Sequence, residues 1–242
     1  MTTDARPDPD DDRFGYSRQA LARLVLSHRL QELSERAMTW IPTTHDMWAH
    51  PGEAVSDLVD LVELAQDALS AAVVYERQKG TSWAAMGEAL GEISRQSAHE
   101  RYSQAVEDWQ LALVEPFEPA AEGARVRSRR LHEAAYEPTA TGRRLDAWAR
   151  EHVERVRDDA HPVTGHLPGL STAEEMVQVL DAVHHAQQSQ AGPAERARLQ
   201  ERKAALLERI AAEDDRPEVA EQAAEARARA AQLRAGAEGG TQ

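Results

Sequence analysis

The sequence predicts an all-α protein, and composition and periodicity both support this fold class. The chain has 242 residues, Ala, Arg, Glu and Leu dominate it, and aromatic residues make up only 5%. The dominant residues lose little conformational freedom on entering a helix. Apolar residues also recur at three- and four-residue steps over several long stretches, which is the spacing of one helix face. We therefore expect an α-helical core followed by a second helical region and a C-terminal helical hairpin.

The N-terminal part of the chain predicts two long helices behind a short tail. Residues 1–13 are rich in aspartate and proline with almost no apolar content, so we expect disorder there. Apolar periodicity predicts a first helix from Ser17 to about Thr39 and a second from about Glu53 to Gln78. Two prolines and a glycine lie between these stretches and break the helical pattern. A lysine followed by glycine, Lys79-Gly80, is a common helix ending.

The stretch from Thr81 to Tyr102, TSWAAMGEALGEISRQSAHERY, predicts two short helices joined by a tight turn. Thr81 and Ser82 supply a cap for the first helix, and Ser94 is a good N-cap for the second. Gly91 lies between them, and glycine adopts the sharp backbone conformation of such a turn at low steric cost. With the preceding long helix as a third wall, this arrangement is a helix-turn-helix core.

The same stretch resembles the WAxxGxALGxSRQxAHxR signature of small helix-turn-helix DNA-binding proteins of high-GC bacteria, over about a tenth of the chain. The resemblance implies that Ser94, Arg95, Gln96, Ala98 and His99 form the front of a recognition helix. One departure concerns the turn, because Glu92 and Ile93 separate Gly91 from Ser94 where the signature has a single residue. The turn is therefore one residue longer, which affects the angle between the helices, and Glu92 adds negative charge near the expected phosphate path.

The residues at the start of this second helix have the chemistry of DNA recognition. Arg95 can donate two hydrogen bonds to guanine, and Gln96 can pair with both edge groups of adenine in the major groove. The free amides of the helix N-terminus favour a phosphate. The candidate DNA-binding residues are Ser94, Arg95, Gln96, Ser97, His99 and Arg101. The alternative is a helical corner whose polar residues simply face solvent.

A run of arginines forms a candidate second patch for phosphate contacts, made of Arg125, Arg127, Arg129 and Arg130. The favoured interpretation of this run is a solvent-exposed face that pairs with nearby acids, because acidic residues lie close by in the sequence. Local ion pairs would then involve Glu115, Glu118, Glu122 and Glu133.

Three further features organise the rest of the chain. A helix is predicted from Thr141 to about Asp158, and Ser171 with Glu174 forms a capping box that opens another helix. The apolar residues expected to be buried on that helix are Met176, Val177, Leu180 and Val183. Pro193 and Pro217 suit the first turns of two last helices. The seam of the final helix, at steps of four and three, consists of Val219, Ala223, Ala226, Ala230 and Leu233.

These features divide the chain into five parts. The predicted parts are a disordered acidic tail (1–13), a helix-turn-helix core domain (14–115), a second helical region (120–190), a charged helical hairpin or coiled coil (193–236) and a flexible tail (237–242). The last pair of helices is either an antiparallel hairpin or one strand of a dimer.

Composition narrows the function classes. The chain has no cysteine, which excludes disulfides and thiolate metal sites. It shows no secretory signal and no membrane-spanning run, so we expect a cytoplasmic protein without a membrane partner, associated with the nucleoid when DNA is bound. The adjacent His184 and His185 diverge on a helix, and His161 and His166 lack a metal-binding spacing. We expect no metal, no cofactor and no catalytic activity.

The net charge of −14 opposes binding to a polyanion, but the acids are unevenly distributed along the chain. The predicted function is sequence-specific binding to double-stranded DNA, as a transcriptional regulator. A homodimer is expected because one recognition helix contacts few bases, and the C-terminal seam or the first helix could supply its interface. The alternative is a non-catalytic interaction or scaffold protein that uses the acidic surface and a C-terminal coiled coil.

Overall fold

The computed structural model describes residues 12–13, 15–44, 50–118, 128–188, 192–214 and 217–239. Within these residues the regular elements are all helices, with one isolated antiparallel bridge between Phe117 and Arg129. The all-α prediction is therefore confirmed. Most of the predicted disordered tail lies outside the described residues, but its last two residues do not behave as a tail. Asp12 accepts hydrogen bonds from the backbone and hydroxyl of Thr139, and Arg13 is buried.

The chain forms two compact units, Met1–Gly169 and Leu170–Gln242. This division differs from the predicted boundaries, because the predicted region 120–190 belongs to both units. Its first part packs against the long N-terminal helix, whereas its last helix packs against the C-terminal hairpin.

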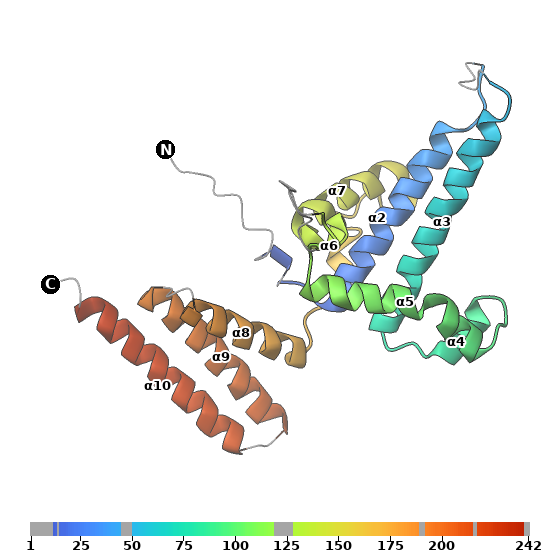
Figure 1. Cartoon of the computed structure of the whole chain (residues 1–242). Coiled ribbons are helices and arrows are strands. Elements are labelled where there is room, and N and C mark those ends of the chain that lie inside the picture. The colour runs from blue at the N-terminus through green and yellow to red at the C-terminus, as the bar shows by residue number, and fades with distance from the viewer. Residues whose placement is uncertain are drawn as a thin grey trace, which may run out of the picture. The chain divides into compact units, whose positions relative to one another are not determined.

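The first unit is built around two long helices that lie side by side, α2 (Arg18–Thr39) and α3 (Glu53–Gln78) (Figure 1). Both agree with the predicted ranges. The Ser17 hydroxyl caps α2 by accepting a hydrogen bond from the Ala20 amide at 3.0 Å. Gly52 precedes α3 with a φ of +93°, a left-handed conformation that glycine adopts at little cost.

Two helices follow, joined by a short turn, α4 (Trp83–Ala89) and α5 (Arg95–Val114). The chain then returns to α2 through α6 (Glu133–Tyr136) and α7 (Pro138–His152). One core joins these helices, and its most buried large side chains include Leu24, Leu131, Leu145, Met86 and Trp109.

The predicted helix from Thr141 to Asp158 is shifted in the structure. α7 begins three residues earlier because Pro138, whose fixed φ suits a first turn, is its first residue. It ends at His152, where Val153 turns to an extended conformation, and a 3₁₀ turn follows at Glu154–Val156. A second 3₁₀ turn, η2 (Thr164–His166), follows it in the chain and packs on α7.

The second unit contains α8 (Thr172–Gln188), α9 (Pro193–Asp214) and α10 (Pro217–Gly239). The capping box at the start of α8 is confirmed, because the Glu174 amide donates to the Ser171 hydroxyl and the Glu174 carboxylate accepts from the Ser171 amide. The seam of α10 is also confirmed as the buried face of a hairpin with α9. α10 extends to Gly239, so residues 237–239 of the predicted flexible tail are helical.

The predicted inner face of α8 is partly wrong. Val177 and Leu180 are exposed, whereas Val179 and Ala186 are buried. Each step along a helix rotates the side chain by 100°, so the face that meets α9 is turned by about one residue from the predicted face.

Candidate nucleic-acid interface

Two serine caps fix the helices of the corner that α4 and α5 form. The Ser82 hydroxyl accepts a hydrogen bond from the Ala85 amide at 3.2 Å at the start of α4. The Ser94 hydroxyl accepts from the Ser97 amide at 3.0 Å at the start of α5 and lies 2.9 Å from the Ser97 hydroxyl. Both caps were predicted from the sequence, and each satisfies an amide that a helix start leaves without a partner.

The turn between α4 and α5 holds its extra residue in an unusual way. Gly91 has a φ of +97°, as the turn requires, and Glu92 follows it with a φ of +61°. Two consecutive residues are therefore left-handed, and the second is not a glycine. The Ile93 amide then donates to the Gly87 carbonyl at 3.0 Å, which closes the turn on α4.

Gly87 is a position whose importance the sequence analysis missed. A Cβ atom at residue 87 would lie 2.4 Å from the Ile93 carbonyl oxygen, closer than real contacts allow. The absence of a side chain therefore lets the turn pass directly over α4. A glycine inside a helix pattern is itself a signal of close backbone approach, and this signal was present in the sequence.

The C-terminal half of α3 supplies the third wall of the corner. Val73 and Val74 of α3 belong to the same buried cluster as Met86 of α4 and Tyr102 of α5. On α5 the buried residues recur at steps of three and four, as Ala98, Tyr102, Val106, Trp109 and Ala112. These residues fix which side of α5 faces the core, and therefore which side faces solvent.

Trp83 connects all three helices at the edge of the corner. The Arg77 guanidinium of α3 lies 5.0 Å from its ring centroid, and the His99 ring of α5 lies 5.1 Å away in an edge-on arrangement. Arg77 also donates to the Thr81 carbonyl at 2.5 Å. His99 therefore has a structural contact on one side while the residue as a whole remains exposed.

All six predicted DNA-contacting residues lie on the first two turns of α5 or at its cap, and all six are exposed. The exposed set is Ser94, Arg95, Gln96, Ser97, His99 and Arg101. Ala98, between them, is fully buried. Gln96 donates to the Glu100 carboxylate at 2.8 Å, so its amide has a partner on its own helix.

Acidic residues surround this surface. Glu88, Glu92 and Glu100 are exposed on or beside the corner. Glu76, at the end of α3, accepts hydrogen bonds from Lys79 at 2.7 Å and Thr81 at 2.6 Å, which lower the pKa of its carboxyl group. The surface near Arg95 and Arg101 is thus mixed in charge.

The arginine run is divided by the structure. Arg125 and Arg127 lie outside the described residues. Arg130 donates to both carboxylate oxygens of Glu118, at 3.0 and 2.9 Å, and to Glu115 at 3.2 Å. Arg129 is exposed, and its guanidinium lies 4.4 Å from the ring centroid of Tyr136. The pairing of Arg130 agrees with the favoured interpretation of local ion pairs.

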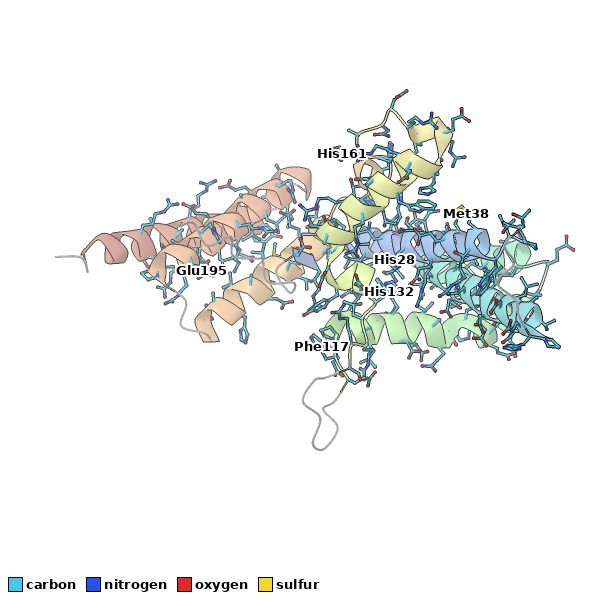
Figure 2. The ribbon with its side chains drawn as sticks, turned by 90° about the horizontal axis from the view of Figure 1, so that it is seen from above. His28, Met38, Phe117, His132, His161 and Glu195 are labelled. Carbon is cyan, nitrogen blue, oxygen red and sulfur yellow. The ribbon has the colours of Figure 1, made fainter. Side chains whose placement is uncertain are left out.

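One cluster in the described part of the chain has ligand atoms close enough to hold a metal ion, His28, Glu32 and His132. Figure 2 labels the two histidines of this cluster. Its ligand atoms lie within 4.8 Å of one another. The i,i+4 spacing of His28 and Glu32 is visible in the sequence, but His132 joins them only through the fold.

Other interactions already engage Glu32 and His132, whereas the buried His28 Nδ1 has no hydrogen-bond partner in the described part of the chain. Arg29 donates to the Glu32 carboxylate at 3.1 Å, and the His132 Nδ1 accepts from the Ala134 amide at 3.1 Å. Burial, together with the charges of Arg29 and His28, lowers the pKa of His132 to about 4, so its ring is neutral at pH 7. With Nδ1 accepting, the proton of this neutral ring is on Nε2, which therefore has no free lone pair for a metal. The cluster is consistent with a cap and an ion-pair network.

A cavity of about 290 Å³ opens between α2, α3 and the C-terminal half of α5. Arg29 and Arg130 line it, but Arg29 lies 3.7 Å from Asp67, and Arg130 is held by Glu115 and Glu118. Its arginines are therefore committed to carboxylates of the same chain. The cavity lies beyond the exposed first turns of α5 that carry the predicted contacts.

Comparison with models of protein families, with curated proteins and with solved structures finds no match to this chain. No helix in the described ranges combines the length and the apolar character needed to cross a membrane.

Proposed function

We propose that this protein binds double-stranded DNA in a sequence-specific way, as a transcriptional regulator that places the start of α5 in the major groove. The observation that carries the proposal is the exposure of all six candidate residues on one capped helix start, opposite a buried face. A major groove about 12 Å wide admits one α-helix, whose first residues meet the base edges.

The first two turns of α5 divide the work between bases and phosphates. Arg95 contacts a guanine through two hydrogen bonds, and Gln96 contacts an adenine after releasing Glu100. Ser94 and Ser97 lie at the helix N-terminus, where the free amides and the helix dipole favour a phosphate. His99 and Arg101 extend the contact surface by one turn.

The acids around the corner support selective binding. Glu92 and Glu100 repel phosphates that approach off the productive path, so nonspecific affinity is low. Specific contacts must compensate for this repulsion, which favours two copies on two half-sites. A homodimer is part of the proposal for this reason. Arg130 is not assigned a phosphate contact because Glu115 and Glu118 already engage it.

The test is a selection of bound duplexes from a random pool at low and physiological salt, followed by sequencing. Wild type is compared with the double variant Arg95→Ala, Gln96→Ala. The control is Gln104→Ala, Gln110→Ala, which removes two exposed side chains further along the same helix. We expect the first variant to lose about 100-fold in affinity for the selected sequence, because each bidentate base contact contributes about 1–3 kcal/mol. The control should keep the wild-type preference.

The same selection addresses the competing function, a non-catalytic interaction or scaffold protein. If wild type enriches no sequence, or both double variants enrich the same sequence equally well, DNA recognition by α5 is refuted. The exposed apolar residues of α3 favour a protein partner in that case.

A further inference from the structure

α3 carries two apolar stripes, although a helix on the surface of a protein usually has one. The first stripe is buried or half-buried and includes Leu61, Leu64, Ala68 and Ala71. The second stripe consists of Val55, Leu58, Val59, Val62 and Leu69, which expose 42–68% of their surface. Within the described residues of the first unit, nothing covers this second stripe. A contiguous apolar surface of this kind marks an interaction site.

The exposed stripe has the spacing of a coiled-coil seam. Val55, Val62 and Leu69 follow one another at steps of seven, with Leu58 and Ala65 between them. Two heptads are covered in this way, and the seam is centred on Val62.

The charges of α3 avoid this seam. The e and g positions, which flank the seam in the heptad, hold no charged residue. They are Ala54, Val59, Leu61, Gln66 and Ala68. The acids of the same segment occupy the outer heptad positions, as Glu53, Asp57, Asp60, Glu63 and Asp67. In a chain with a net charge of −14, two identical surfaces would ordinarily repel each other. The uncharged flanks keep like charges out of direct contact at this face.

We propose that the exposed stripe of α3 is the interface with a second copy of this chain. The five side chains present on the order of 500 Å² of apolar surface, which matches the apolar share of a standard interface of about 800 Å² per partner. A two-fold axis through the seam pairs the same patch on both copies, so identical chemistry on both sides is sufficient. This interface is the dimer of the proposed function, but the exposure, spacing and charge of the stripe do not depend on DNA binding.

The interface leaves the DNA-binding corner accessible. Val62 and Gln78 are 16 residues apart on α3, a distance of about 24 Å at 1.5 Å per residue. Figure 1 shows α4 and the start of α5 at the opposite end of α3 from Glu53. Two copies joined at the seam therefore each retain an exposed recognition helix.

The mass of the full-length chain in solution tests the interface, measured by light scattering and sedimentation without DNA. We expect a dimer for wild type at 20–50 μM. Val62→Glu should weaken dimerisation by about 100-fold, because it places unpaired charges in the interface. Ser56→Glu adds the same charge to an exposed position of the same helix outside the seam and should remain dimeric. Circular dichroism confirms that both variants fold.

Cross-linking provides a second test, because the chain contains no cysteine. A single cysteine at position 62 lies at the centre of the seam and meets its own copy, so Val62→Cys should form a covalent dimer on mild oxidation. Ser56→Cys should not. The expected result is a cross-linked band for Val62→Cys alone. The rate of cross-linking should follow the fraction of chains in the noncovalent dimer.

Either of two results would overturn the inference. First, wild type could be a monomer at 50 μM. This result would refute the interface, and the stripe would then be covered by another protein or by the C-terminal helices. Alternatively, Val62→Glu could remain as dimeric as Ser56→Glu, which would assign the dimer to another surface. The mass measurement contains no DNA, so its result is independent of the duplex selection. A wild type that is dimeric but selects no duplex would refute the proposed function and leave the interface intact.

Discussion

At the scale of single residues, Glu92 stores strain in the turn between α4 and α5. Its φ of +61° is a left-handed conformation in which the Cβ atom crowds the backbone. The conformation persists because Gly91 before it and the Ile93 amide after it, bonded to Gly87, fix the path of the chain. The residue that lengthens the turn is thus also the residue that destabilises it.

Replacing Glu92 by glycine should therefore stabilise the protein. We expect Glu92→Gly to raise the free energy of unfolding by about 0.5–1 kcal/mol, since glycine adopts this φ without the penalty. Glu92→Val, which is β-branched, should lower it by a similar or larger amount. Thermal unfolding of the three proteins measures the effect, and equal midpoints for the glycine and valine variants would show that the turn is not strained.

At the scale of elements, Asp146 ties α7 to the 3₁₀ turn η2. Its buried carboxylate accepts hydrogen bonds from the amides of Val163 and Thr164 at 2.8 and 3.0 Å, and from the Thr164 hydroxyl at 2.5 Å. Burial alone would raise the pKa of Asp146, but these bonds outweigh it and lower the pKa below the ordinary value of 3.8. One side chain thus accepts hydrogen bonds from two amides and a hydroxyl of a half-buried turn.

The Asp146 tether predicts a pH-dependent stability. Because the folded-state pKa is lowered, the contribution is present above the unfolded value of 3.8 and is lost as the pH falls through the folded value. At pH 7 we expect Asp146→Asn to cost about 2 kcal/mol, since an amide cannot accept all of these bonds. Asp158→Asn, at an exposed position, should cost almost nothing.

Denaturant unfolding between pH 7 and pH 3 measures this difference. The gap between wild type and Asp146→Asn should narrow toward the acidic end, because wild type then loses the charge that the variant lacks. A gap that stays constant over this range would mean that packing, rather than the carboxylate, connects α7 to η2.

The elements differ in how well the sequence predicts them. Caps are local, so Ser17, Ser82, Ser94 and the Ser171 capping box could be identified from a few neighbouring residues. The inner face of α8 could not, because it depends on which side α9 approaches. The exposed stripe of α3 could not be predicted for the same reason. In the sequence its two apolar stripes form one continuous pattern, and only the packing of α2 shows which of them is buried.

The candidate site shows the same contrast. Exposure of Arg95 and Gln96 follows from the periodicity of α5, which buries Ala98 and Tyr102. The contacts of Trp83 with Arg77 and His99 combine residues from three helices, and only the fold brings them together. Sequence therefore predicted which residues are presented, whereas the structure explains what holds them in place.

At the scale of the whole molecule, the two units have cores of different size. The buried cluster of the first unit joins residues from α2 to α7 and includes Trp109 and Tyr102. The cluster of the second unit contains Leu207, Val219 and Ala223, with Met176 and Ile210 beside it. Apolar burial is the main favourable term in folding, so the second unit should be the less stable of the two.

Calorimetry of the full chain should therefore show two transitions, of which the one at lower temperature belongs to residues 170–242. Units with separate cores unfold separately unless a large interface couples them. A chain shortened to Met1–Gly169 should lose only the lower transition and keep the upper one at the same temperature. It should also retain both the duplex preference set by α5 and the dimer set by α3, because both surfaces lie in the first unit. A single transition in the full chain, or a shifted upper transition in the shortened one, would show instead that the C-terminal helices stabilise the first unit.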